Sequence, residues 1–143
     1  MGSQRLLAGI AGGLAGGVIF GAMMQMMGML AMIGGLIGQE SAGVGWIVHL
    51  GISVVFGLIY AVTFGSLSAS WGRAAGFGAV YGVIWWVLGA LVLMPASMGM
   101  PVFQIGAMQL QSLVGHLIYG VALGVVFQAL VQSRSEQRAP SRA

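Results

Sequence analysis

The sequence has no cysteine and very little charge. It has five Lys or Arg and two Asp or Glu, so charged residues make up 5% of the chain. The missing cysteine excludes disulfides, thiolate metal sites and cysteine nucleophiles. A water-soluble domain has roughly a quarter of its residues charged, which this chain does not approach. With 59% hydrophobic residues, the composition instead predicts a protein that lies in a lipid bilayer.

Four apolar runs are long enough to cross a bilayer as helices. A spanning helix needs roughly 20 mostly apolar residues for about 30 Å of hydrocarbon. The runs lie at about 6–27, 44–64, 74–94 and 111–131. We therefore predict an all-α integral membrane protein, a four-transmembrane-helix bundle in which 1–143 form a single membrane domain with a disordered basic tail at about 133–143.

The scarcity of acids and of catalytic motifs limits the possible functions. No acidic residue lies inside an apolar run, and this argues against the usual proton- or cation-coupled transport. The chain has no Ser-His-Asp set, no HExxH and no phosphate-binding loop. The pI of about 10.2 reflects a few arginines without a soluble domain to present them. We expect neither an enzyme nor a nucleic-acid-binding protein.

The arginines predict the orientation. Arg5 precedes the first run, Arg73 lies between the second and third, and Arg134, Arg138 and Arg142 follow the fourth. All five therefore fall on one side of a four-span topology. Because short cytoplasmic segments carry the excess of Lys and Arg, we expect a multi-pass protein of the cell inner membrane, in contact with membrane lipids and with both termini in the cytoplasm.

The two halves of the sequence resemble each other. Sliding the sequence by 67 residues superposes His49 on His116 and Gly57 on Gly124. Sliding it by 65 residues superposes two Gly-Val-Ile triplets, one in the first run and one in the third. The placement of these residues predicts two tandem two-helix repeats, related by a pseudo-two-fold axis along the membrane normal.

The two histidines are the main candidate binding residues. His49 and His116 lie about one and a half turns inside the outer ends of their runs, where ionisable residues usually face the bundle interior. Ser53 and Gly120 follow four residues later, on the same helix face, and leave room beside each imidazole. This arrangement predicts either two hydrogen bonds between helices or the two axial ligands of a haem b.

Methionine gathers toward the outer side. Apart from Met1, every methionine lies in the outer half of a run or in an outer connection. Met23 and Met27 have the spacing that places two sulfurs on one helix face. Together with His49 and His116 they supply the thioether and imidazole ligands that copper(I) prefers. The alternative is that these methionines are adaptable packing groups, because they are scattered around the whole helix.

Glycines form rows that predict close helix contacts. The first run has glycines at four-residue spacing, and the third run has a shorter counterpart. Small residues on one face let two backbones approach closely in lipid, within the bundle, in a homo-oligomer or in a larger membrane complex. The residues are Gly9, Gly13, Gly17 and Gly21 in the first run, and Gly78 and Gly82 in the third.

Two prolines follow the third run. Pro95 and Pro101 lie in the segment Met-Pro-Ala-Ser-Met-Gly-Met-Pro. Because proline removes a backbone N–H and clashes with the preceding turn, we expect the third helix to break here. The residues that follow should form an irregular element at the outer face.

The sequence leaves three functions open. We expect a small structural or accessory component of the inner membrane that acts through helix packing. The alternatives are a membrane redox protein that binds haem b or copper through the two histidines, and a small oligomeric channel or carrier. The histidine-bearing helices resemble those of small bacterial membrane proteins, and this resemblance implies no particular chemistry.

Overall fold

The computed structural model describes residues 2–138, with side chains described up to Arg134. Four long apolar helices, each able to span a membrane, make up this part of the chain, as the apolar runs predict. They are α1 (Gly2–Met26), α3 (Ala42–Thr63), α4 (Trp71–Trp85) with its continuations η1 (Trp86–Leu93) and α5 (Met94–Ser97), and α6 (Ala107–Arg138). A short helix, α2 (Leu30–Gly35), lies in the connection between α1 and α3.

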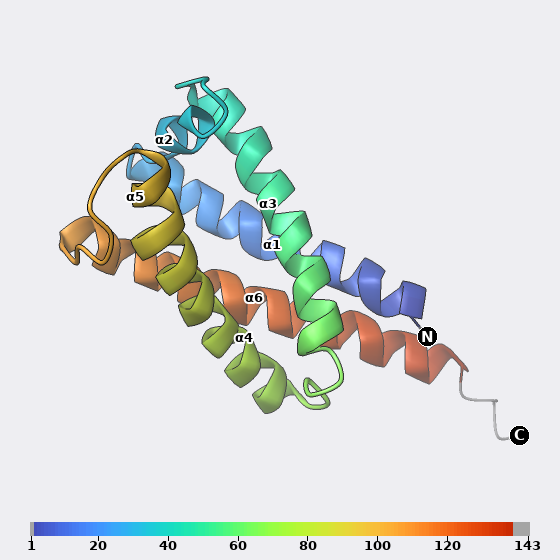
Figure 1. The fold of residues 1–143 in the computed structure, drawn as a ribbon. Coiled ribbons are helices and arrows are strands. Elements are labelled where there is room, and N and C mark those ends of the chain that lie inside the picture. Colours follow the sequence, from blue (N-terminus) through green and yellow to red (C-terminus); the bar gives the residue numbers. More distant parts are fainter. Residues whose placement is uncertain (1, 139–143) are drawn as a thin grey trace, which may run out of the picture.

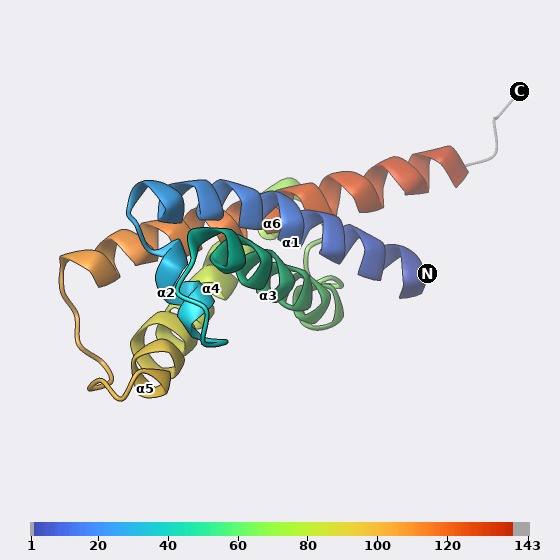
Figure 2. The same cartoon turned by 90° about the horizontal axis from the view of Figure 1, so that it is seen from above.

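The first and last helices form the centre of the bundle. α1 packs against both α3 and α6, and α4 packs against α6, so the order across the bundle is α3, α1, α6, α4 (Figures 1 and 2). The N-terminus, the α3–α4 connection and the end of α6 lie at one end, which we call the terminal end. Helices α2 and α5 lie at the other end, which we call the connection end.

Main-chain atoms touch directly where α1 crosses α3. A Cβ atom added at Gly9 would collide with the carbonyl of Gly57, and one added at Gly13 would collide with the carbonyl of Ser53. At Gly17 it would collide with the Ser53 side chain. The predicted glycine row thus faces α3, where glycine lets the two backbones approach and gain van der Waals contact in lipid.

The α4–α6 crossing is built in the same way. Glycines lie four residues apart on both helices, at Gly78 and Gly82 of α4 and at Gly120 and Gly124 of α6. A Cβ atom added at any of them would collide with a carbonyl of the other helix. The pairs are Gly78 with Gly120, Gly82 with His116, and Gly124 with Ala74. Here too, the helices are held by backbone proximity.

A second glycine row on α1 packs against α6. Gly12 and Gly16 would each collide with a carbonyl of α6, those of Leu123 and Tyr119, if they carried a Cβ. α1 therefore has two small faces, one for each neighbour. This explains why the first helix of the chain lies in the centre of the bundle.

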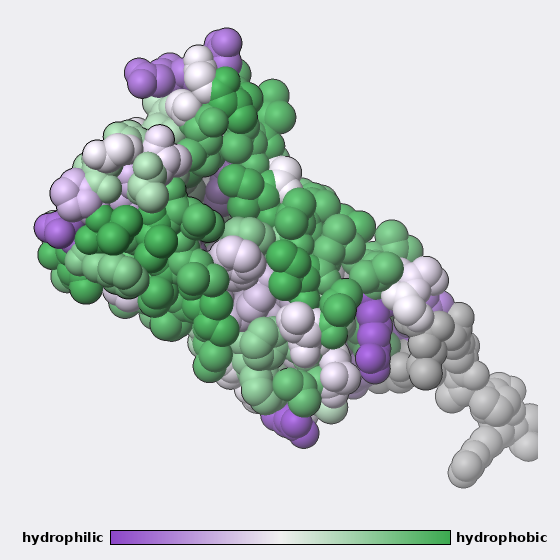
Figure 3. All heavy atoms as spheres, in the orientation of Figure 1, coloured by the Kyte–Doolittle hydropathy of each residue, from purple (hydrophilic) through white to green (hydrophobic). Residues whose placement is uncertain are grey.

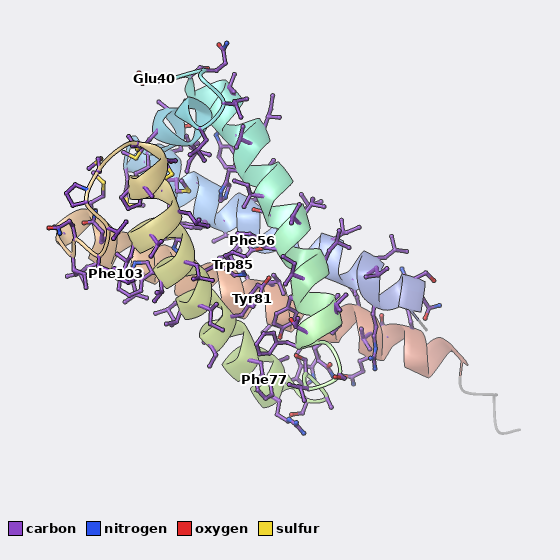
Figure 4. All side chains as sticks on the ribbon, in the orientation of Figure 1. Glu40, Phe56, Phe77, Tyr81, Trp85 and Phe103 are labelled. Carbon is purple, nitrogen blue, oxygen red and sulfur yellow. The ribbon has the colours of Figure 1, made fainter. Side chains whose placement is uncertain are left out.

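Helices α3 and α4 meet through aromatic rings, with their backbones held apart. Facing rings form three pairs, which we call the aromatic ladder (Figure 4): Phe56 with Trp85 (3.6 Å between centroids), Tyr60 with Tyr81 (5.3 Å) and Phe64 with Phe77 (5.9 Å). The Tyr81 hydroxyl also donates to the Phe56 carbonyl at 2.6 Å. Beyond this ladder the two helices diverge toward the connection end (Figure 1).

The expected break at Pro95 was wrong, because the helix continues through this proline to Ser97. Proline clashes with the carbonyl four residues earlier and cannot donate to it. In this chain the turn before Pro95 is the wider π-helix η1, and the carbonyl of Leu91 instead accepts from the N–H of Phe103 at 2.8 Å. Phe103 adopts a positive φ of 55° as the loop folds back to make this bond.

The predicted disordered tail begins too early. Helix α6 extends to Arg138, so residues 133–138 are helical. Ser, Arg, Glu and Gln are all tolerated in a helix, and neither glycine nor proline occurs between Val131 and Pro140. Residues 139–143 lie outside the described residues.

Candidate functional site

The two histidines lie in one layer of the bundle, around Phe20 of α1. The Phe20 ring contacts the imidazole of His49 with 5.6 Å between centroids and that of His116 with 4.8 Å, edge to face in both cases. On the α6 side Phe20 fills a notch at Gly115, where any side chain would collide with the ring. Helices α1, α3 and α6 thus each contribute one ring to this layer.

His49 bonds across the helix contact. It is 7% exposed, and its Nε2 lies 2.9 Å from the carbonyl oxygen of Gly17 on α1. Because a carbonyl oxygen only accepts hydrogen bonds, Nε2 carries the proton and donates, which leaves the lone pair of a neutral imidazole on Nδ1. His49 therefore ties α3 to α1, which is one of the two bonds between helices that the sequence predicted; the other, at His116, is not formed.

His116 bonds within its own helix. Its Nδ1 lies 2.8 Å from the carbonyl oxygen of Ser112 and 3.3 Å from the Ser112 hydroxyl. The same reasoning places the proton on Nδ1 and the lone pair on Nε2. His116 is only partly buried, so the two histidines differ in both their partner and their exposure.

Ser53 and Gly120 lie in helix contacts, where the sequence predicted open space. Ser53 is buried against α1, and its hydroxyl donates to the carbonyl of His49 at 2.8 Å. The backbone of α4 at Gly78 lies against Gly120. The four-residue spacing that suggested room for a ligand is here the spacing of close-packed helices.

The residues around the two imidazoles do not fit a haem held between them. Bis-axial ligation places the two ring nitrogens on opposite faces of a macrocycle. Phe20 is in contact with both imidazoles, and His49 is bonded to α1. A macrocycle in this position would have to replace the Phe20 ring and separate the helices that it joins.

The methionines of α1 differ in burial, and Met24 is the most buried of them. Met24 is 3% exposed and belongs to the same buried core as Phe20, whereas the predicted pair Met23 and Met27 is partly buried and packs against that core. Met26 is 80% exposed. Sequence reasoning missed Met24, although it follows Phe20 by four residues and so lies on the same helix face.

Most polar side chains of the spans bond to the protein's own groups. Besides the bonds of the histidines, Tyr119 donates to the carbonyl of Ser53 at 3.2 Å and Trp86 donates to the carbonyl of Gln109 at 2.8 Å. Among the described side chains, the indole nitrogen of Trp85 is fully buried without a bond of hydrogen-bonding geometry. It lies beside Tyr81 in the aromatic ladder.

A hollow opens where α3 diverges from η1 and α5. Figure 3 shows it between the upper and left parts of the molecule, with apolar walls and hydrophilic surface at its base. Among the described residues, no group of three or more His, Cys, Asp or Glu gathers here or elsewhere to hold a metal ion. The nitrogen donors of the bundle are thus the two imidazoles.

Comparisons with known proteins give no match. No protein family matches the chain, and neither the curated proteins nor the solved structures contain a significant relative.

Proposed function

We propose that the chain is a structural or accessory protein of the bacterial inner membrane that acts through helix packing and is not an enzyme. One observation carries this proposal. Several polar side chains inside the spans bond from one helix to another: His49 of α3 bonds to α1, Tyr119 of α6 bonds to α3, and Tyr81 of α4 bonds to α3.

The same contacts disfavour catalysis. A nucleophile needs a base within hydrogen-bond reach and a third group that orients the base. The buried hydroxyl of Ser53 donates to a main-chain carbonyl and not to an imidazole. The Ser112 hydroxyl touches His116, but His116 already donates Nδ1–H to the Ser112 carbonyl. Neither serine is therefore arranged for activation.

The lipid-facing surface supplies the means to bind a partner helix. Large apolar side chains are exposed on α3, including Ile47 (74%) and Val62 (73%). Lipid covers such residues, and a neighbouring membrane protein covers them equally well. A protein that acts through packing must present this kind of surface to its partner.

Photo-crosslinking from the native membrane tests the proposal. A photoreactive amino acid is placed at Ile47 or Val62, and the buried position Leu123 serves as the control. We expect one discrete adduct, with a second copy of the chain or with another membrane protein, from at least one exposed position. Adducts with lipid alone from every exposed position on all four spans would contradict an accessory role.

For orientation, we propose that the terminal end faces the cytoplasm. Arg5 in the first turns of α1, Arg73 in the first turn of α4 and Arg134 near the end of α6 support this, since they all belong to that end (Figure 1). A cysteine introduced near Arg73 should be labelled by a membrane-impermeant thiol reagent only after the cells are permeabilised, so that the reagent reaches the cytoplasmic side. Labelling in intact cells would reverse the orientation.

We also propose that the α1–α3 and α4–α6 pairs arose by tandem duplication. Support comes from the helix contacts: Gly13 faces Ser53, and Gly78 faces Gly120, at positions that the two sequence shifts relate. A chimera that carries residues 49–60 in place of 116–127 should fold. A second chimera, in which the inserted segment is shifted by two residues, should not fold. If both chimeras fold, or if neither does, the result argues against the duplication.

A further inference from the structure

We propose that the loop between α5 and α6, residues 98–106, binds membrane lipid and holds the side chains of Phe103 and Ile105 among the acyl chains of the leaflet at the connection end. These two side chains are 59% and 61% exposed. The contact lies outside the spanning helices, and it does not depend on the packing role proposed above.

The first support is the depth of the loop. The continuous helix made by α4, η1 and α5 ends at Ser97. Counted from Arg73, roughly 20 residues cross the hydrocarbon, which places its other edge near Leu93. The N–H of Phe103 donates to the carbonyl of Leu91 at 2.8 Å, six residues before Ser97. Because six residues correspond to roughly 9 Å along a helix, the loop descends from the end of α5 to the edge of the hydrocarbon.

The two connections at this end differ in the direction they take. Figure 4 shows Glu40, in the connection between α2 and α3, at the tip of the connection end. Phe103 is set back from that tip, beside η1 and the start of α6. A carboxylate at the tip belongs in water, so the aromatic ring lies on the membrane side of it.

The second support is the chemistry of the loop. No Asp, Glu, Lys or Arg lies between Arg73 and Arg134. Besides Phe103 and Ile105, three large apolar side chains of the loop are exposed: Met98 (48%), Met100 (54%) and Val102 (39%). Removing such a surface from water is favourable, and the acyl chains at the same depth remove it without any protein partner.

The third support is continuity with the lipid-facing surface of the spans. Leu110, Val114 and Ile118 recur at four-residue steps, so they lie on one face of α6. They are 52%, 51% and 38% exposed. On the other side of the loop, Leu93 is 61% exposed. The loop therefore joins two segments that face lipid, and its apolar side chains extend that surface.

The loop backbone suits the boundary between headgroups and acyl chains. Irregular backbone is unstable in hydrocarbon unless its polar groups are satisfied. In this loop Pro101 has no N–H, and five other N–H groups bond within the protein: those of Met98, Gly99, Met100, Phe103 and Gly106. The carbonyls accept from water among the headgroups, while the apolar side chains reach roughly 5–10 Å further in, as those of interfacial helices do.

Spin labelling in lipid nanodiscs that hold one chain each tests the proposal. The wild-type chain has no cysteine, so a single introduced cysteine carries the nitroxide at one known position. Oxygen concentrates in lipid and a nickel chelate in water, so the ratio of their collision rates with the label reports its surroundings. Phe103→Cys and Ile105→Cys should give a ratio close to that of Ile47→Cys, at the lipid-facing position on α3. Glu40→Cys, in the other connection, should give a much lower ratio.

Two results of this measurement would overturn the proposal. A ratio at Phe103→Cys as low as that at Glu40→Cys would place the loop in water. Low collision rates with both reagents would mean that protein, and not lipid, covers the loop.

Proton NMR of the wild-type chain in the same nanodiscs gives a second measurement that does not depend on a label or on the folding of variants. The ring protons of Phe103 should show nuclear Overhauser contacts with the acyl-chain protons of the lipid. Phe127, which is 0% exposed, should show none and serves as the control. Contacts of the Phe103 ring with water and not with acyl chains would overturn the proposal.

Discussion

The α1–α3 pair and the α4–α6 pair are joined by the same main-chain contacts but use their histidines differently. In both pairs, small residues at four-residue steps let one backbone touch the other. His49 bonds across its pair to Gly17, whereas His116 bonds to Ser112 of its own helix. The close contact of the helices therefore does not depend on a histidine bridge, and the bridge is an addition in one pair.

The aromatic positions differ in the same way. Tyr60 of α3 and Phe127 of α6 are both fully buried. The Tyr60 hydroxyl lies 2.8 Å from the Ser68 hydroxyl, in the connection to α4, while Phe127 has no hydroxyl to place. His49 and Tyr60 of the first pair thus make polar contacts that His116 and Phe127 of the second pair do not make. Four sets of substitutions can separate the contribution of packing to stability from that of hydrogen bonding.

The largest loss of stability should come from placing large side chains at the glycines where two helices cross. Gly13→Leu and Gly78→Leu place a side chain against a carbonyl of the facing helix, where only backbone movement can make room. We expect each variant to lose more than about 3 kcal/mol of stability, at the upper end of overpacking costs, and to yield little folded protein. Gly51→Leu is the control, because Gly51 has open space around it. Reversible unfolding in mixed micelles measures the difference.

If Gly13→Leu were tolerated and Gly78→Leu were not, the two crossings would not be equivalent in energy. The contact of main chain with main chain would then not be the common basis of the two pairs.

A smaller effect should follow from opening the aromatic ladder. Phe56→Ala removes the ring that stacks on Trp85 at 3.6 Å. We expect the free energy of unfolding to fall by about 2 kcal/mol, because Phe56 is only partly buried and lipid can fill part of the space. This is less than the same change costs in the core of a soluble protein. Tryptophan fluorescence followed during unfolding measures the change. Val55→Ala, at a lipid-facing neighbour, should change stability by less than half as much.

The histidines provide the most direct comparison of the two pairs. His49→Leu removes a bond between helices, and His116→Leu removes a bond within one helix. In membrane proteins a hydrogen bond between helices contributes on average about 0.6 kcal/mol and up to about 1.7 kcal/mol. We expect His49→Leu to be the more destabilising change by an amount in this range. Equal losses would show that both imidazoles act only by filling space.

The smallest effect should come from Tyr81→Phe. This change removes the bond to the Phe56 carbonyl but keeps the ring in the ladder. We expect a loss of about 0.6 kcal/mol, the average for such bonds. Tyr119→Phe, which removes the bond to the Ser53 carbonyl, is the matched change at the α3–α6 contact. A loss of several kcal/mol at Tyr81 would mean that the hydroxyl, and not the rings, sets the α3–α4 distance.

Much of the helix arrangement was predictable from local pattern. The apolar runs predict four spans because lipid thickness fixes their length. The glycine row from Gly9 to Gly17 predicts a close contact, although nothing in the sequence says that α3, and not another copy of the chain, provides the other side. The second row, Gly12 and Gly16, indicates a second neighbour in the same way.

The remaining features depend on tertiary contacts. The helix passes Pro95 because Phe103 satisfies the carbonyl of Leu91, and the spacing of the sequence does not show this bond. Which nitrogen of each imidazole donates follows from which carbonyl lies near each ring. That Met24 is buried in the core while Met23 and Met27 are only partly buried depends on where α3 and α6 lie around α1.

The central position of α1 and α6 has a consequence for biosynthesis. Translation delivers α1 to the bilayer before α6, so the contact of Gly12 and Gly16 with α6 forms only after the two intervening spans have been made. Until then, a glycine-lined groove on α1 stays without its final neighbour. Contacts between segments far apart in sequence slow folding, and a nascent chain of this design depends on lipid or the insertion machinery to cover that groove in the interval.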